Sequence, residues 1–359
     1  MQRRTMIMSS LATLTGWSFS TANAQKSPSQ GTWSSLNDMP FPVQEIYPTL
    51  FIRNGKPLIV NAGGLAVALG RPIKSACTIY DPATDEWSRG VDLPETRHHV
   101  ALTHVPDIGI FAIGGFKRQG LDIWAAQSQV WRIADPTSGQ WEEARPLPVP
   151  RAEAVTLHKD GQIHMIGGRS PGPANEGWSD QRDTGFHHIY DPQADKWEEA
   201  APMPVPRNSS TGAVIGNTIY IVSGRTVKSG NTPLCHAYDT ATDAWREVAP
   251  LPVPERQSAP HGQGGLAGGA FNGKLYAFGG EWFKGQLSPD DEGGVYADTW
   301  EYNPVTDTWR PVAEMIRPRH GLGGVSIEGF GSVDGMYAIG GAARPSGSGV
   351  TPHLDRFVI

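Results

Sequence analysis

Cysteine is scarce in this sequence, and so are other features that mark particular protein classes. The 359 residues contain two cysteines, too few for a disulfide framework. The chain has no cluster of Lys and Arg and a formal net charge of −6, so it lacks the basic footprint of a nucleic-acid-binding protein. No stretch shows sustained helical periodicity. Instead, 43 glycines and 30 prolines predict many short strands joined by tight turns.

The N-terminus has the layout of a secretory signal peptide. The pair Arg3-Arg4 precedes a mildly apolar stretch, and the small residues around Ala24 suit cleavage after it. Paired arginines are typical of twin-arginine export, although the general secretory route stays open. The apolar stretch is too short and too rich in Ser and Thr to span a bilayer. We therefore expect residues 1–24 to be removed, residues 25–359 to form one domain, and the protein to be periplasmic or secreted.

Pairs of small residues recur along the chain at intervals of about 50 to 60 residues, a period that indicates a repeat architecture. Each pair follows an apolar run that predicts a strand, and a polar turn such as Asp160-Gly161 precedes most of these runs. Each repeat therefore begins with a hairpin that ends in the small pair. The six pairs are Gly63-Gly64, Gly114-Gly115, Gly167-Gly168, Ser223-Gly224, Gly279-Gly280 and Gly340-Gly341.

A second pattern follows each of the first five pairs. A Tyr, replaced once by Ala134, is followed by Asp or Asn, and a Trp stands seven residues after it. Six residues after the Trp comes Leu or Met, and a Pro-rich turn then leads to an Arg that we expect to serve the structure of every repeat. The tryptophans are Trp87, Trp141, Trp197, Trp245 and Trp309.

This spacing resembles that of kelch repeats over nearly all of the chain, and departures such as Ser223 are local. The resemblance implies units of about 50 residues that form four-stranded blades around a central axis. Six small pairs imply six blades. The fold class expected is all-β, a six-bladed kelch β-propeller.

The two ends of the propeller are expected to meet in the last blade. The sixth repeat reaches Phe357 at the Tyr position and has no Trp after it, whereas Trp33 stands alone near the N-terminus. Met39 follows Trp33 at the interval seen in the other repeats. An outer strand around Trp33 would therefore complete the last blade and leave no open sheet edge.

Function is expected on one face of this propeller. In a blade with strands a to d, the a–b and c–d turns lie on one face, and the b–c loops and d–a connections lie on the other. The b–c loops are long and dissimilar, so a ligand is expected on the b–c/d–a face near the axis. Residues just after the small pairs would stand at the mouth of the channel there: Leu65, Phe116, Arg169, Arg225, Glu281 and Ala342.

Three of these residues are charged and lie in consecutive blades. Arg169 and Arg225 are candidate ligands for a carboxylate, because guanidinium groups bind carboxylates through two hydrogen bonds. Glu281 is the candidate catalytic acid or base. The alternative is that these charges pair with one another at a solvated rim.

A second candidate set lies where strand a of each blade begins. Peptide-binding kelch proteins use such positions together with those after the glycine pairs, and the resemblance extends to positions and not to residue types. His261 is placed in an enlarged d–a connection of the fifth repeat. The ligand-binding candidates of this set are His99, Glu153, Ser209 and His261, with His98 and His320 beside them.

No metal or other cofactor is expected. Histidines that are neighbours on a strand, as in His98-His99 and His187-His188, would point to opposite faces and chelate poorly. The acidic segment 290–292 has no spacing of a calcium loop and is interpreted as a solvated loop.

The cysteines are expected to be free thiols. Cys77 and Cys235 begin the same strand in blades 1 and 4, which are opposite in the ring and too far apart for a disulfide. Their position also disfavours the copper-radical chemistry of galactose oxidase, a kelch-class propeller that needs a Cys–Tyr cross-link.

Two hypotheses for the function stay open. In the first, the protein binds a small polar ligand, a sugar or sugar acid, or a protein partner, without chemistry. In the second, it is an isomerase. Exported bacterial kelch propellers of this size resemble the sialic acid mutarotases (N-acetylneuraminate epimerases), and that resemblance implies interconversion of sugar-acid anomers. Arginine would then hold the carboxylate, and Glu281 would move the proton.

Overall fold

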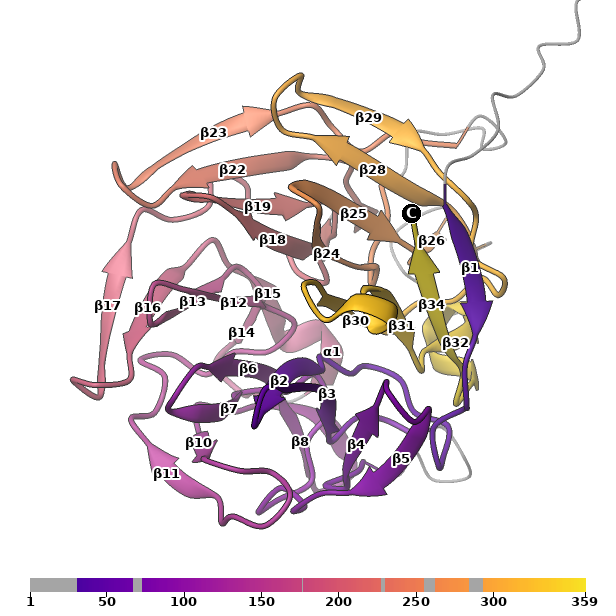
Figure 1. Cartoon of the computed structure of the whole chain (residues 1–359). Helices are drawn as coiled ribbons and strands as arrows, with labels where there is room; N and C mark the ends of the chain where they lie inside the picture. Colours follow the sequence, from indigo (N-terminus) through magenta and orange to yellow (C-terminus); the bar gives the residue numbers. More distant parts are fainter. Residues whose placement is uncertain (1–30, 67–72, 176, 227–229, 255–261, 284–292) are drawn as a thin grey trace, which may run out of the picture.

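Six antiparallel four-stranded sheets surround a central axis in the computed structural model of this chain (Figure 1). The innermost strand of each blade is strand a and the outermost is strand d. The predicted signal peptide, residues 1–24, and the acidic segment 290–292 lie outside the described part. The structure describes residues 31–66, 73–175, 177–226, 230–254, 262–283 and 293–359.

The strands of each blade follow one another along the chain from the axis outward. Blade 1 consists of β2 (Thr49–Arg53), β3 (Lys56–Ala62), β4 (Cys77–Asp81) and β5 (Glu86–Arg89). Blade 2 consists of β6 (Ala101–Val105), β7 (Gly109–Ile113), β10 (Val130–Ile133) and β11 (Glu142–Ala144). Blade 3 consists of β12 (Val155–Lys159), β13 (Gln162–Ile166), β16 (His187–Asp191) and β17 (Lys196–Ala200).

The second half of the ring repeats this order. Blade 4 consists of β18 (Thr211–Ile215), β19 (Thr218–Val222), β22 (Cys235–Asp239) and β23 (Ala244–Val248). Blade 5 consists of β24 (Ala267–Phe271), β25 (Lys274–Phe278), β28 (Thr299–Asn303) and β29 (Thr308–Pro311). Blade 6 consists of β30 (Gly323–Ile327), β31 (Gly335–Ile339), β34 (Leu354–Val358) and β1 (Thr32–Ser35). The short 3-10 helix η1 (Gly331–Val333) lies in its a–b turn.

Blade 6 takes its outer strand from the beginning of the described chain. Strand β1 pairs antiparallel with β34, and Trp33 lies opposite Phe357. The Trp33 indole N–H donates to the Ala313 carbonyl at 3.0 Å, and its ring packs against Phe278. The ring of blades is thus joined by a sheet that contains both ends of the described chain.

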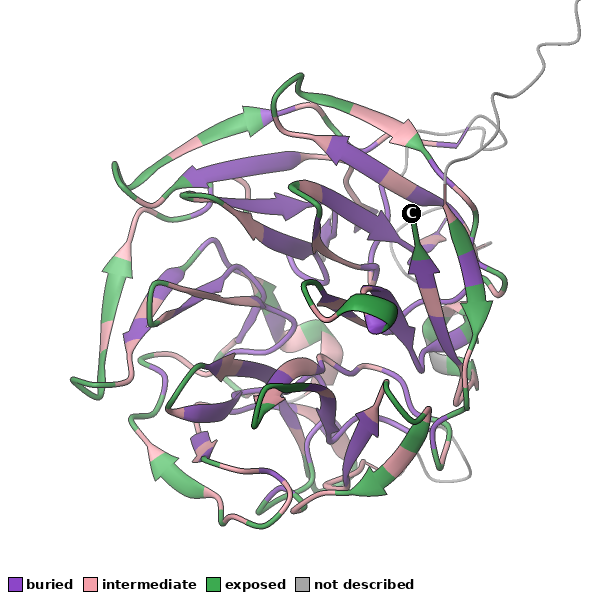
Figure 2. Ribbon diagram, viewed as in Figure 1, coloured by how far each residue is buried: buried purple, intermediate pink, exposed green. Residues whose placement is uncertain are grey.

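The repeated Tyr and Trp have structural roles that explain their spacing. In the same way as Trp33, the indole N–H of Trp87 donates to the Asn37 carbonyl and that of Trp245 to the Ala201 carbonyl, so each Trp bridges to the preceding blade. The Tyr238 hydroxyl donates to Asp243 in the c–d turn of its own blade at 2.8 Å. The apolar core lies between adjacent blades, and Figure 2 shows exposed residues gathered on the outer strands and turns.

The glycine pairs are required by close contact between blades. Gly114 has φ +59°, and a Cβ added there would lie 2.2 Å from the carbonyl oxygen of Arg151 in the next d–a connection. The next glycine donates its N–H to that same carbonyl at 2.9 Å. A side chain at Gly114 would therefore separate blades 2 and 3.

In blades 2 to 6, a short two-stranded hairpin follows each small pair on the b–c face. The b–c loops are therefore more regular than their sequences suggest. In blade 3 the hairpin carries the short helix α1 (Gly177–Asp180), and in blade 6 the 3-10 helix η2 (Pro345–Gly347). The hairpins are β8–β9 (Phe116–Gln119, Asp122–Ala126), β14–β15 (Arg169–Pro171, Gln181–Asp183), β20–β21 (Arg225–Thr226, Gly230–Asn231), β26–β27 (Glu281–Phe283, Gly293–Val295) and β32–β33 (Ala342–Arg344, Ser348–Val350).

Among the described residues, no helix is long and apolar enough to cross a membrane.

Candidate functional site

One residue in each blade turns into positive φ just before strand a. These residues form what we call the axial ring. Backbone hydrogen bonds join them around the axis: the N–H of Glu45 donates to the Gly321 carbonyl at 2.7 Å, and that of His99 to the Glu45 carbonyl at 3.0 Å. Because a non-glycine residue rarely adopts this conformation, the surrounding contacts must hold it there. The axial ring consists of Glu45, His99, Glu153, Ser209, Gly265 and Gly321, with φ between 52° and 61°.

The residue after each glycine pair stacks directly over the axial ring. Backbone bridges connect it to the residue that precedes the axial-ring residue, as between Arg169 and Ala152 or between Arg225 and Asn208. The two candidate sets from the sequence therefore form two adjacent tiers around one axis. The charged cluster consists of their ionisable members and of His320, which directly precedes Gly321 of the axial ring: Glu45, His99, Glu153, Arg169, Arg225, Glu281 and His320.

His99 joins two carboxylates of the charged cluster. Its Nε2 lies 2.8 Å from Glu45 Oε2 and 3.3 Å from Glu153 Oε1. The side chain of Glu153 has no exposed surface, and that of Glu45 keeps 14% of its surface exposed. Ser209 continues the chain of contacts, because its hydroxyl lies 3.4 Å from Glu153 Oε2.

Glu281 lies at the other side of the charged cluster. Its carboxylate accepts a hydrogen bond from Arg225 Nη1 and lies 3.2 Å from His320 Nδ1. The Ser346 backbone N–H also donates to it, at 3.2 Å. Arg225 Nη2 in turn lies 3.9 Å from Glu153, and this contact connects the two halves of the cluster.

Neighbouring charges keep two members of the charged cluster, Glu45 and Arg225, ionised in spite of their burial. Burial alone would raise the pKa of the Glu45 carboxyl, but His99 and the charges beyond it hold this pKa well below its usual range. Burial alone would lower the pKa of Arg225, and the carboxylates of Glu281, Glu153 and Glu45 raise it above its ordinary value instead. Both groups therefore stay charged at neutral pH.

Arg169 is the least satisfied member of the cluster. Its Nη2 donates to the Trp178 carbonyl at 2.6 Å, and its guanidinium stacks on the Trp178 ring at 4.1 Å. Its Nε and Nη1 are buried and have no hydrogen-bond partner among the described residues, and the same is true of Glu153 Oε1. Because nearly all buried polar atoms in proteins are paired, these atoms mark a place for a water molecule or ligand.

Comparisons with known proteins support the repeat assignment. A family model described as the kelch motif matches residues 206–252 and 264–316. Kelch-like protein 23 of Homo sapiens is 26% identical over 262 residues, covering 72% of this chain and 41% of its own length. Kelch-like protein terF of Aspergillus terreus is 22% identical over 341 residues, covering 92% of this chain and 69% of its own length. This chain thus spans about two fifths of the length of the first curated relatives.

The solved structure of YjhT superposes on this chain with a TM-score of 0.71 and 17% sequence identity, covering 89% of this chain and 96% of YjhT. At this identity the likeness concerns the fold. Kelch motifs match at residues 206–252 and 264–316, and the structure has six four-stranded blades. The chain is a six-bladed β-propeller that contains kelch motifs.

The structure of this kelch propeller brings most of the sequence candidates together. Arg169, Arg225, Glu281, His99, Glu153 and Ser209 all belong to the two tiers around the axis. His261 lies outside the described residues. The position in blade 5 that corresponds to His99 is Gly265, because the enlarged d–a connection delays the start of strand a.

Sequence reasoning missed Glu45 and Asn208. Glu45 follows Met39 by six residues, as His99 follows Leu93, so the interval used for Trp33 would have located it. Asn208 Oδ1 accepts hydrogen bonds from Arg225 Nε at 3.2 Å and from the Ser209 hydroxyl at 2.9 Å.

The expected orientation of one histidine pair is corrected. His98 and His99 do not point to opposite faces, because the positive φ of His99 breaks the strand alternation, and their Nδ1 atoms lie 2.7 Å apart. His187 and His188 do diverge: His187 contacts His164, and His188 contacts Arg151.

Two further features of the described residues concern metal ligands and cysteines. That part of the chain contains no group of three or more His, Cys, Asp or Glu side chains arranged to hold a metal ion. Cys77 and Cys235 are buried free thiols, and burial raises the pKa of each.

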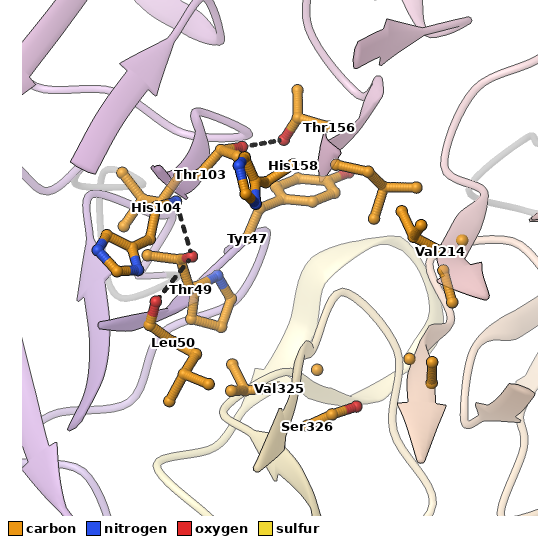
Figure 3. Close-up of a pocket in the computed structure, with 18 of the residues that line it drawn as sticks. Tyr47, Thr49, Leu50, Thr103, His104, Thr156, His158, Val214, Val325 and Ser326 are labelled. Carbon is orange, nitrogen blue, oxygen red and sulfur yellow. Dashed lines mark hydrogen bonds between the residues drawn. The ribbon is translucent and has the colours of Figure 1, made fainter. Parts of the chain in front are cut away.

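A cavity of about 960 Å³ extends along the axis on the other side of the axial ring (Figure 3). We call it the channel. The strand a residues of all six blades line it, and it reaches the exposed a–b turn residues Asn54 and Asp107. A ligand was expected on the b–c/d–a face, so the channel is a second candidate site on the opposite side.

Proposed function

We propose that this kelch propeller binds a small polar ligand that carries a carboxylate, at the charged cluster on its b–c/d–a side. The observation that carries the proposal is Arg169, whose Nε and Nη1 are buried without a hydrogen-bond partner among the described residues. Its ion pair with Glu153 is long, at 3.9 Å. A carboxylate can accept from two N–H groups of one guanidinium, which makes it a chemical match for these donors.

A sugar acid fits the neighbouring residues as well. The carboxylates of Glu153 and Glu281 accept hydrogen bonds from hydroxyl groups, and the Trp178 ring that covers Arg169 offers an apolar face to a sugar ring. The Ser209 hydroxyl and Asn208 side chain add further polar contacts.

The test is calorimetric titration with sugar acids such as glucuronate and N-acetylneuraminate. We expect Arg169→Gln to weaken binding of the acid that binds best by about tenfold or more, since a charged hydrogen-bond donor is lost. Arg132→Gln is the control, because Arg132 is partly exposed and pairs with Glu142 at the outside of blade 2. Unchanged affinity in Arg169→Gln, or no binding of any acid to the parent protein, would contradict the proposal.

Catalysis on such a ligand is the second candidate function. Glu281 Oε2 and His320 Nδ1 lie 3.2 Å apart, and a carboxylate–imidazole pair is suited to moving a proton. The reaction would be the interconversion of sugar-acid anomers that the resemblance to sialic acid mutarotases implies. Magnetisation exchange between anomers in NMR measures it: the parent protein should accelerate exchange, and Glu281→Gln should slow it sharply. Equal exchange rates with and without protein, across several sugar acids, would exclude this reaction.

A protein partner is the alternative occupant of the same face. Leu121, at the tip of the β8–β9 hairpin, is fully exposed and would lie in such a contact. Substitution of Leu121 by Asp would then weaken the partner's binding and leave sugar-acid binding unchanged.

Export remains part of the proposal. The support is the twin-arginine and small-residue pattern of residues 1–24. Expression of the full chain in a bacterial host, followed by N-terminal sequencing of periplasmic protein, should find Gln25 as the first residue. Recovery of the unprocessed chain from the cytoplasm alone would contradict export.

A further inference from the structure

The channel wall mixes hydroxyl groups with apolar side chains. Its hydroxyl groups include those of Thr103 and Thr156 in blades 2 and 3 and that of Ser326 in blade 6. Its apolar side chains include those of Val214 in blade 4 and Val325 in blade 6. Figure 3 shows Thr103 and Thr156 close to one another, and Ser326 beside Val325. A wall of this kind matches a molecule that carries both hydroxyl groups and C–H faces.

The wall of the channel carries almost no charge. Among the described residues that line it, the one carboxylate is that of Asp107, which is exposed at the rim, and no Lys or Arg side chain takes part. Burial lowers the pKa of His104 to about 4 and also lowers that of His158, so both imidazoles are neutral at pH 7. An ion entering the channel would lose its hydration without finding an opposite charge, which favours an uncharged occupant.

Two hydroxyl groups remain available to such an occupant. The Tyr47 hydroxyl has no hydrogen-bond partner among the described residues, and burial together with Glu153 and Glu45 raises its pKa, so it stays a donor. The Thr156 hydroxyl accepts from Thr103 at 2.8 Å and keeps its own hydrogen to donate. The Tyr47 ring also provides an aromatic surface beside these donors.

The channel ends at the axial ring. Between Ser209, Gly265 and Gly321 the axial ring leaves a gap of about 10 Å³, the size of one water molecule. Within the described residues, a small organic molecule in the channel therefore stays separate from Arg169 and Glu281 on the b–c side.

We propose that the channel is a second binding site, open at the a–b turns, for a neutral polyhydroxylated molecule such as a sugar or polyol. Its hydroxyl groups contact Tyr47 and Thr156, and its C–H face packs on Val214 and Val325. This site is independent of the carboxylate site proposed above, because it uses other residues on the other side of the axial ring.

Saturation-transfer NMR with glucose, maltose and inositol tests the proposal, with titration calorimetry to measure affinity. We expect at least one of these probes to bind the parent protein. Tyr47→Phe should weaken it about three- to tenfold through the loss of one hydrogen bond. Val214→Trp should abolish binding by filling the channel, and Thr156→Val is a milder variant in case the Trp substitution unfolds the chain.

Two controls make the result specific. Tyr190→Phe removes a hydroxyl that donates to Asp195 in the c–d turn of blade 3, away from the channel lining, and it should leave probe binding unchanged. Arg169→Gln should also leave it unchanged while weakening sugar-acid binding. The inference is overturned if no neutral probe binds, if binding survives both Tyr47→Phe and Val214→Trp, or if Arg169→Gln removes it.

Discussion

Glu45 Oε2 lies 2.8 Å from Nε2 of His99, so this contact joins blade 1 to blade 2 at the axis. Glu45 thus belongs to the charged cluster and also makes a contact that links two neighbouring blades. The same two residues are joined by a backbone hydrogen bond of the axial ring.

Replacement of Glu45 by Gln should destabilise the protein by about 1–3 kcal/mol, because His99 would lose its carboxylate partner and Arg225 a nearby buried opposite charge. Since the folded pKa of Glu45 lies below its unfolded value, its contribution is present above the unfolded pKa and is lost as pH falls through the folded pKa. Chemical denaturation of parent and variant should therefore differ most near pH 7. Glu86→Gln, at an exposed position on β5, is the control. Equal loss in both variants would refute a special role for Glu45.

Buried histidines should make the protein acid-sensitive. Burial lowers the pKa of His98 to about 3 and that of His164 to about 4, whereas both titrate near 6.5 when unfolded. Between pH 6.5 and about 4 the unfolded chain binds protons that the folded chain does not. Stability should then fall as pH falls, by up to about 1.4 kcal/mol per pH unit for each histidine. Thermal melts across this range measure it, and His164→Asn should flatten the dependence. An identical slope in parent and variant would contradict this cause.

Trp33→Ala should cost about 3–5 kcal/mol, since a buried ring and its indole hydrogen bond are lost from the joint of blade 6. Trp87→Ala, at the corresponding and more exposed position of blade 1, is the matched comparison and should cost less. Urea denaturation of the two variants gives the difference. A larger loss in Trp87→Ala would show that the joint has no special weight.

Ser223→Gly should destabilise the protein even though Ser223 has φ 53°. Its hydroxyl accepts from the Gln263 N–H and donates to the Thr232 carbonyl, both at 2.8 Å. Losing these two contacts costs about 1–3 kcal/mol each, which together exceeds the roughly 1–2 kcal/mol that glycine relieves in the left-handed region. Asn272→Gly, at an exposed turn position with φ 50°, should be neutral or stabilising. Calorimetric melts compare the two, and stabilisation in both would disprove the role of the hydroxyl.

The fold was predictable because each spacing that recurs between the repeated residues of this chain corresponds to one physical contact. The Trp interval reflects the indole bond to the preceding blade, and the glycine pairs reflect close backbone approach. The repeated arginines proved structural where they are described: Arg207 and Arg319 are buried and donate to backbone carbonyls of their blades. Arg256 lies outside the described residues.

The candidate site was only partly predictable. Counting along the repeat located Arg169, Arg225 and Glu281, since they follow the glycine pairs. It failed in blade 5, where an enlarged connection shifts the axial-ring position to Gly265. The channel gave no sequence signal, because it depends on where small and polar residues of six strands face one another across the axis.

Because β1 pairs with β34, blade 6 can be completed only after the last described strand has been synthesised. Thr32–Ser35 is synthesised first among the described strands, yet its partner, Leu354–Val358, is synthesised last. Until β34 has been synthesised, the backbone N–H and C=O groups of β1 have no partner strand. The strands of the other five blades can pair before that point. Blade 6 therefore depends on pairing between β1 and β34, which lie far apart in the sequence. Contacts of this kind slow folding. A chain that ends before Leu354 would lack β34, so β1 would have no partner and blade 6 would stay incomplete.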